Sequence, residues 1–185
     1  MISVELSTAS RERLIALGRK FPKAGASALN KIARQAKTFT SAEIRKDYNI
    51  KKSVLDPQMS VQARASERNL EARLRAKAKG KIPLYDFGPR PSDVIRPQPG
   101  RGVRVTVKKG NRQLFQGTFI ARMKSGHIGV FKRQGKERTP IKELFTFRIT
   151  QLLGSREMAN RLKGFFAEAY PRILKQELNY YFLKH

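Results

Sequence analysis

The chain has 185 residues, of which 39% are hydrophobic and 29% charged, so it is long enough to build one domain with a real core. It holds 40 Lys and Arg against 14 Asp and Glu, a net charge of +26, and no Cys. These numbers exclude disulfides and cysteine-based zinc sites, and they favour an anionic or tightly complementary partner. No apolar run approaches the roughly 18–20 residues that span a bilayer, and no signal-peptide core is apparent, which predicts a protein made in a cytoplasm without a membrane partner.

Two helices are predicted within residues 1–50. The first covers about residues 8–20, and Pro22 then opens the second, which runs from 23 to 48. One face of the first helix carries Leu14, Leu17 and Phe21. The apolar stripe of the second consists of Leu29, Ile32, Ala33, Ala36, Phe39 and Ile44. Both stripes predict helices that pack against the rest of the chain.

Residues 58–150 are predicted to be rich in strands. Apolar and polar residues alternate through 59–65 and again through 70–78, which indicates two half-buried strands joined by a turn at 66–69. The high alanine content keeps one amphipathic helix open as an alternative for this stretch.

A proline-rich loop is predicted over residues 80–102, because five prolines and four glycines fall within it. The strand pattern returns after it at 103–107, at 115–121 and at 128–131, which predicts an antiparallel meander of three or more strands. Pro140 is predicted to stop the last of them.

The C-terminal segment, residues 155–185, is predicted to be helical. Its apolar stripe consists of Leu162, Phe165, Phe166, Ala169, Ile173, Leu174 and Leu178. Pro171 is expected to kink this helix or to divide it. The predicted fold is therefore a single α+β domain over residues 1–185, with N-terminal helices, an antiparallel sheet and a long C-terminal helix.

The sequence offers no catalytic, cofactor-binding or metal-binding constellation. His127 and His185 are far apart in a chain without Cys, so a transition-metal site is not expected, and His127 is predicted to be a structural residue at a turn or strand edge with no partner to orient it. Glu43 and Asp47 are expected on a solvated helix face beside Lys46 and other cations. The chain is predicted not to be an enzyme and to need no cofactor.

The most informative feature is a basic stretch without acids, residues 94–136. Strand alternation predicts that one face of the sheet buries the valines while the other displays the cations. Such a field predicts contact with DNA or with an acidic partner protein, without sequence-specific readout. The candidate contact residues are Arg104, Lys108, Lys109, Arg112, Arg122, Lys124, Lys132, Arg133 and Lys136.

Several stretches together resemble the prophage minor tail protein Z family of long-tailed bacteriophages. They include ALNKIARQAKT (28–38), KGKIPLYDFGPR (79–90), GVRVTVKKG (102–110) and FIARMKSGHIGVFKR followed by GKERTPIKELF (119–145). The resemblance runs from about residue 21 to 154.

The resemblance implies a structural virion protein at the head-proximal neck of the tail, without enzymatic activity. Expected partners are the neck and tail proteins around it, such as the terminator and connector layers, further copies of itself in a closed ring, and the end of the packaged duplex DNA. The proline-rich segment and the C-terminal helix are expected to reach neighbouring chains. A protein that binds nucleic acid non-specifically, free of any virion, is the alternative that the charge supports.

Overall fold

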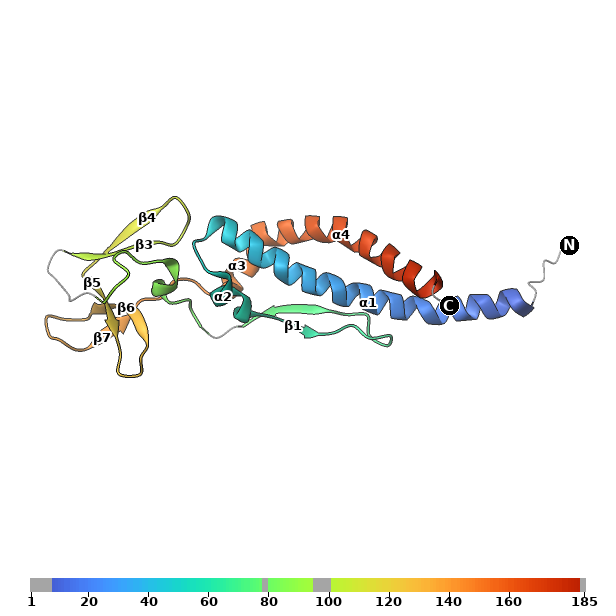
Figure 1. The fold of residues 1–185 in the computed structure, drawn as a ribbon, viewed down its shortest axis with the longest axis horizontal. Helices are drawn as coiled ribbons and strands as arrows, with labels where there is room; N and C mark the ends of the chain where they lie inside the picture. The colour runs from blue at the N-terminus through green and yellow to red at the C-terminus, as the bar shows by residue number, and fades with distance from the viewer. Residues whose placement is uncertain (1–7, 78–79, 95–100, 184–185) are drawn as a thin grey trace. The chain divides into compact units, whose positions relative to one another are not determined.

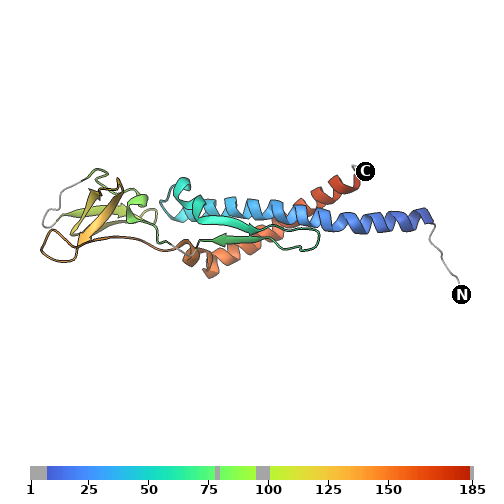
Figure 2. The same cartoon turned by 90° about the horizontal axis from the view of Figure 1, so that it is seen from below.

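The computed structural model describes residues 8–77, 80–94 and 101–183, without the side chains of residues 8–17, 19 and 63. It contains a long N-terminal helix α1 (Thr8–Asp47), small antiparallel sheets and a long C-terminal helix α4 (Arg156–Leu183), which confirms the predicted α+β fold (Figures 1 and 2). The chain divides into two compact units. We call the described residues of 8–38, 61–75 and 159–183 the helical unit, and those of 39–60 and 76–158 the sheet unit.

The predicted break at Pro22 is wrong, because α1 is one helix of 40 residues with Pro22 inside it. A proline removes the N–H that would bond the carbonyl four residues earlier, which here belongs to Gly18. Gly18 is exposed, so water can bond that carbonyl and the helix continues. Phe21, expected on an apolar face, is 54% exposed, and the side chains of Leu14 and Leu17 lie outside the described part of the chain.

The predicted hairpin is confirmed, and the alternative of one helix is not. Strands β1 (Met59–Ala63) and β2 (Arg73–Ala76) pair in a two-stranded sheet. Ser66 and Asn69 exchange backbone hydrogen bonds of 2.8 and 3.2 Å across the expected turn. The side chain of Asn30 both donates to and accepts from the backbone of Ala65, at 2.8 Å each, and so ties the hairpin loop to α1.

The core of the helical unit lies between α1 and α4. Ala28 and Ile32 pack with Ala169 and Ile173, a pairing of the two helices that was not predicted from the sequence. The expected division at Pro171 is wrong, since α4 runs unbroken through it, although Figure 1 shows the helix bending along its length. Here too the carbonyl left without an N–H belongs to an exposed residue, Ala167.

The sheet unit contains two antiparallel sheets. The first pairs β3 (Gly102–Thr106) with β4 (Arg112–Gln116). The second has the order β5 (Thr118–Arg122), β6 (Ile128–Arg133) and β7 (Ile141–Glu143). Val103, Val105, Ile120 and Val130 are fully buried between them and the neighbouring segments.

Two strand boundaries differ from the prediction. The expected strand at 115–121 is divided at Gly117, which has φ +68° and separates β4 from β5 and hence the two sheets. Pro140 precedes β7 and does not end β6, which stops at Arg133. The strand β7 was not predicted, because three residues are too few to show an alternating pattern.

The described part of the predicted loop 80–102 is packed inside its own unit. A 3₁₀ helix, Leu84–Phe87, buries both of its end residues, and Ile82 beside it is 3% exposed. Backbone hydrogen bonds connect Leu84 to Leu144 and Arg90 to Arg104. Ile82, Leu84 and Phe87 are therefore used within the protomer, whereas Val94 is 55% exposed. Residues 95–100 lie outside the described part of the chain.

Two short elements complete the sheet unit. Helix α2 (Lys52–Leu55) continues into a 3₁₀ turn, Asp56–Gln58, where the buried Ser41 hydroxyl donates to Asp56 Oδ1 at 2.5 Å. Helix α3 (Ile149–Leu153) precedes α4, and the side chain of Gln151 accepts from the backbone N–H of Arg148 at 3.0 Å.

Candidate functional site

Four of the nine candidate cations lie on or beside the β3–β4 sheet. Arg104 and Arg112 share its exposed face, because the register pairs Arg104 with Leu114 and Arg112 with Thr106. Lys108 lies in the connecting turn with its Nζ 6.0 Å from the ring centre of Tyr48. The exposed Lys109 donates its backbone N–H to the carbonyl of Asp47 at 2.9 Å. The predicted division into a valine face and a cation face is confirmed here.

The other five lie on the three-stranded sheet and its loops. Arg122 and Lys132 occupy the same face of that sheet by register, whereas Arg133 points to the opposite face, is half-buried and has a buried Nε without a hydrogen-bond partner. Lys124 lies in the turn from β5 to β6 and Lys136 in the loop from β6 to β7, and antiparallel topology puts these two connections at opposite ends of the sheet. The nine cations therefore do not converge on one point.

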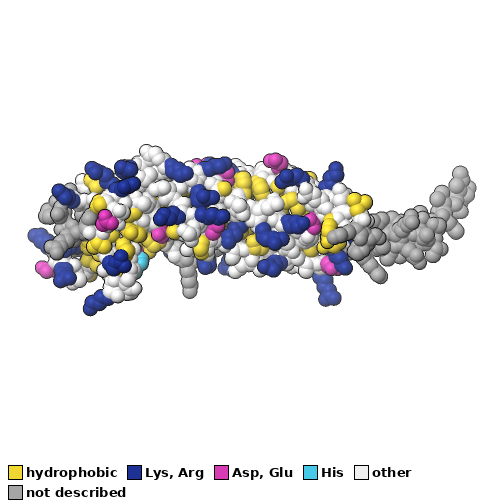
Figure 3. Space-filling model, viewed as in Figure 1, with side chains coloured by type: hydrophobic (Ala, Val, Ile, Leu, Met, Phe, Trp, Pro, Cys, Tyr) yellow, Lys and Arg dark blue, Asp and Glu magenta, His cyan; other side chains and the backbone are white. Residues whose placement is uncertain are grey.

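The field of these cations is nevertheless not neutralised locally. Within the described residues, none of the nine forms a salt bridge. Figure 3 shows Lys and Arg side chains spread over the visible face of the molecule, with few acidic side chains among them. A dispersed positive surface attracts polyanions or acidic proteins by long-range electrostatics and carries no catalytic chemistry.

The two phenylalanines of the central strands are not available to stack on bases. Phe119 and Phe131 are 7% and 5% exposed, and their ring centres are 6.2 Å apart. Both rings pack in the core, so neither offers the stacking surface that single-stranded nucleic acid binding would use.

His127 lies in the β5–β6 turn directly before β6, as predicted, but the expectation that it has no orienting partner is wrong. Its Nε2 lies 2.8 Å from Oε1 of Glu143 on β7. Glu143 finds room because Gly129 lacks a side chain: a Cβ there would be 2.7 Å from Glu143 Oε1. The signal in the sequence was Gly129, which could be interpreted only once the pairing of β6 with β7 was known.

A third ionisable group belongs to this neighbourhood. Burial raises the pKa of Asp86, and the charge of Glu143 raises it further, while His127 and Lys51 act in the opposite direction.

Among the described residues, no group of three or more potential ligands could hold a metal ion. His185 lies outside the described residues. The pair formed by His127 and Glu143 therefore ties the β5–β6 turn to β7.

Glu43 and Asp47 are also not a catalytic pair. Glu43 forms a salt bridge with Lys46, as expected, but it is only 8% exposed, so the prediction of a fully solvated face is wrong for this residue. Asp47 is exposed, and its backbone carbonyl is the acceptor for Lys109. Both carboxylates belong to the end of α1, where they contribute to local structure.

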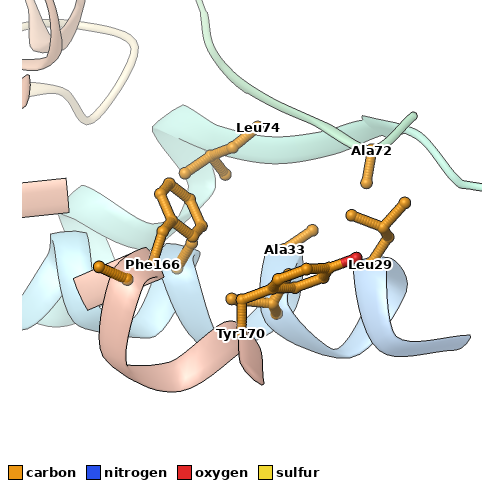
Figure 4. Close-up of a pocket in the computed structure, with 9 residues that line it drawn as sticks. Leu29, Ala33, Ala72, Leu74, Phe166 and Tyr170 are labelled. Atoms are coloured by element: carbon orange, nitrogen blue, oxygen red, sulfur yellow. The ribbon is translucent and has the colours of Figure 1, made fainter. Parts of the chain in front are cut away.

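A hollow that was not predicted lies within the helical unit. It is an open apolar groove with a volume of about 460 Å³. Figure 4 shows the ring of Phe166 pointing toward Leu74 and the ring of Tyr170 reaching toward Leu29. Its walls are side chains of α1, the hairpin and α4: Leu29, Ile32, Ala33, Ala36, Ala72, Leu74, Phe166, Ala167 and Tyr170. No charged side chain lines it, so it can take up apolar groups only.

One partly buried ion pair stabilises the same unit. Lys31 of α1 donates to Glu177 of α4, which is 4% exposed. Burial alone would raise the pKa of Glu177, yet hydrogen bonds from Lys31 and Ser27 and the positive charge of Lys31 outweigh it and lower that pKa. This pair therefore has a structural role.

Comparison with known protein families decides what kind of protein this is. The family described as prophage minor tail protein Z (GPZ) matches residues 6–184. The chain belongs to this family. The match includes α1 from near its start and α4 to its end, and so extends the resemblance seen in the sequence between residues 21 and 154.

Membership of the minor tail protein Z family makes the chain a structural component of a phage tail, and hence of the virion, that contacts other tail proteins. Neither the curated proteins nor the solved structures gave a match. In the described residues, no helix is long and apolar enough to cross a membrane.

Proposed function

We propose that this minor tail protein completes the head-proximal end of a long phage tail and joins the tail to the connector of the head. The observation that carries the proposal is the family match over residues 6–184. The role requires binding surfaces and no reaction, and the side chains described above supply salt bridges, a sheet surface and an apolar groove. The protein acts without catalysis or a cofactor, and its 185 residues work as one functional domain.

The neck position implies particular partners. Copies of the chain form a closed ring through heterologous contacts, with terminator and connector layers on either side. The protein is made in the host cytoplasm and is retained in the virion neck. The nine candidate cations contact acidic surfaces of those layers or the end of the packaged duplex, because within the described residues they have no salt-bridge partner.

A reconstruction of the virion neck by cryo-electron microscopy tests this proposal. The expected result is density for the chain as a closed ring between connector and tail tube. Infection with phage that lack the protein is expected to produce complete heads and complete tails that do not join. A complete neck without this chain, or normal joining in its absence, would overturn the proposal.

Non-specific nucleic-acid binding outside the virion is the second candidate, and the net charge of +26 favours it. The isolated chain would then bind duplex DNA with an affinity that falls steeply with salt. Salt-dependent assembly with neck proteins, in the absence of DNA, would instead favour the structural role.

A further inference from the structure

Strand β4 has one open edge. Arg104 of β3 exchanges backbone hydrogen bonds of 2.7 and 3.0 Å with Arg90, so its N–H and C=O point away from β4. Leu114 is the cross-strand partner of Arg104, and in an antiparallel ladder both members of such a pair turn their backbone groups outward. The N–H and C=O of Leu114 therefore point to the open edge, and within the described residues neither has a backbone partner across it.

A groove of about 480 Å³ follows this edge. Three consecutive residues of β4, Leu114 to Gln116, line it, although alternate residues of a strand point to opposite faces. They can share one hollow only along the edge of the strand, and β3 already occupies the other edge. The opposite wall is formed by Leu144 and Phe145.

Two large apolar side chains of the groove are left in water. Leu114 is 45% exposed and Phe145 is 46% exposed, and both line the groove. The hydrophobic effect favours covering two such groups when they lie side by side. An extended chain added to β4 would cover both while its backbone bonds Leu114.

The one charged residue among those that line the groove is positive. Lys132 lines it, and Lys142 is the cross-strand neighbour of Lys132. Arg104 and Arg112 share the face of β4 from which Leu114 projects. Since residues 94–136 contain no acid, the occupant that fits this charge is negative.

We propose that the open edge of β4 binds an extended segment of another protein, with apolar and acidic residues on the same face, as an additional strand. The outward backbone groups of Leu114 supply main-chain hydrogen bonds, Leu114 and Phe145 cover apolar side chains, and the four cations pair with carboxylates. DNA would use only the cations, and neither the main-chain hydrogen bonds nor the apolar side chains. The identity of the partner as a tail protein rests on the function proposed above, but the binding chemistry does not.

The test uses the full-length chain and a synthetic eight-residue peptide, Val-Val-Glu-Glu repeated twice, which carries both Val and Glu on each face when extended. Its affinity is measured by fluorescence anisotropy. A peptide of the same sequence that is N-methylated at every residue has the same charge but offers no main-chain N–H on either edge. We expect it to bind at least about tenfold more weakly, as is typical when two or more main-chain hydrogen bonds are lost. Equal affinity for the two peptides would overturn the proposal.

Variants of the protein locate the site. Leu114→Pro removes an N–H that points outward and leaves the pairing with β3, so we expect the β3–β4 sheet to persist and the peptide affinity to fall about tenfold. Thermal unfolding checks the fold of the Leu114→Pro variant. If this variant does not fold, the comparison of the two peptides on the original chain still tests the proposal. The paired change Arg112→Gln with Lys132→Gln should weaken binding, whereas Arg172→Gln with Lys175→Gln, at exposed positions of α4, should not.

Duplex DNA separates the two classes of ligand. If DNA displaces the peptide and binds the Leu114→Pro variant as well as the original chain, the groove is part of a general cationic surface and the proposal fails. Peptide binding that survives this comparison would stand even if the chain proved absent from the neck, so failure of the inference and failure of the neck assignment can be told apart.

Discussion

The two units carry similar charge but use it differently. The segments of the helical unit, residues 1–38, 61–75 and 159–185, hold 17 basic and 6 acidic residues, a net charge of +11, and those of the sheet unit hold 23 and 8, a net charge of +15. In the helical unit, described acids pair with cations of the same unit, such as Glu177 with Lys31 and Glu67 with Lys23. In the sheet unit, the stretch 94–136 has no acid to pair with. Elsewhere the sheet unit also pairs its charges, as Glu43 does with Lys46, so the difference lies in this one stretch, whose cations are left for a partner.

The largest expected effect is in the sheet unit. Phe87 is fully buried, its ring lies edge-on to Phe147 with centres 5.7 Å apart, and its carbonyl accepts from the side chain of Asn49 at 3.0 Å. Phe87→Ala should lower the free energy of unfolding by about 3–5 kcal/mol, because it leaves a cavity in a closed core. Urea denaturation measures this loss.

Phe145→Ala is the matched control, since the same side chain is 46% exposed in the same unit. It should cost much less than Phe87→Ala. Equal costs would mean that the segment around Phe87 is held by something other than its own core, for example a neighbouring chain, and would restore the expectation that residues 80–102 reach out of the protomer.

The next effect is in the helical unit and depends on pH. The pKa of Glu177 is lowered in the folded chain, so its ionised form stabilises the fold at pH values above its ordinary pKa of 4.5. That contribution is lost as the pH falls through the lower pKa of the folded state. Glu177→Gln should lower the free energy of unfolding at pH 7 by about 1–2 kcal/mol, since Lys31 remains half exposed and can be solvated.

Unfolding at pH 7 and at pH 3 checks this sign. The difference in stability between Glu177→Gln and the original chain should shrink at pH 3. Glu168→Gln, at an exposed position of the same helix, should show no such dependence. A difference that grew with acidity would mean that Glu177 is held in its neutral form.

Much of the helical unit could be predicted from sequence, because helices and hairpins are encoded locally. The stripes containing Ile32 and Ile173 predicted which face of each helix is buried, and Ser66 and Asn69 marked the turn. Sequence alone did not show that Pro22 and Pro171 lie inside continuous helices. In both cases the carbonyl that loses its N–H belongs to an exposed residue, Gly18 or Ala167, and this exposure is a tertiary property.

The sheet unit was predicted less well because its pairing is not local. Gly117 falls within an apolar run, and only the folded chain shows that it separates two sheets. The partner of His127 is 16 residues away on a strand of three residues, and the open edge of Leu114 depends on Arg90 covering β3. The cations themselves could be predicted from composition; their dispersal over two sheets could not.

A smaller effect tests the pair of His127 and Glu143. In Gly129→Ala the new Cβ would lie 2.7 Å from Glu143 Oε1 and 3.1 Å from Phe131 Cε2, so the carboxylate must move away. We expect a loss of about 1 kcal/mol in stability, with a change in the NMR signals of the His127 ring. Gly135→Ala, where a Cβ meets nothing within 4 Å, should leave those signals unchanged. Unaltered ring signals in Gly129→Ala would show that Glu143 does not orient His127.

The smallest expected effect concerns the apolar groove of the helical unit. It decides whether only the sheet unit, or both units, leave apolar surface uncovered. Phe166 is 39% exposed, so Phe166→Ala should cost only about 1 kcal/mol, whereas Ile173→Ala, on the buried face of the same helix, should cost about 2–5 kcal/mol. Urea denaturation of the two variants gives the ratio. A small cost for Phe166 means that its ring is poorly used within the unit, so the helical unit, like β4, keeps apolar surface that its own fold does not cover. If Phe166→Ala proved as costly as Ile173→Ala, the groove would be a structural part of the core, and the sheet unit alone would present a surface for partners.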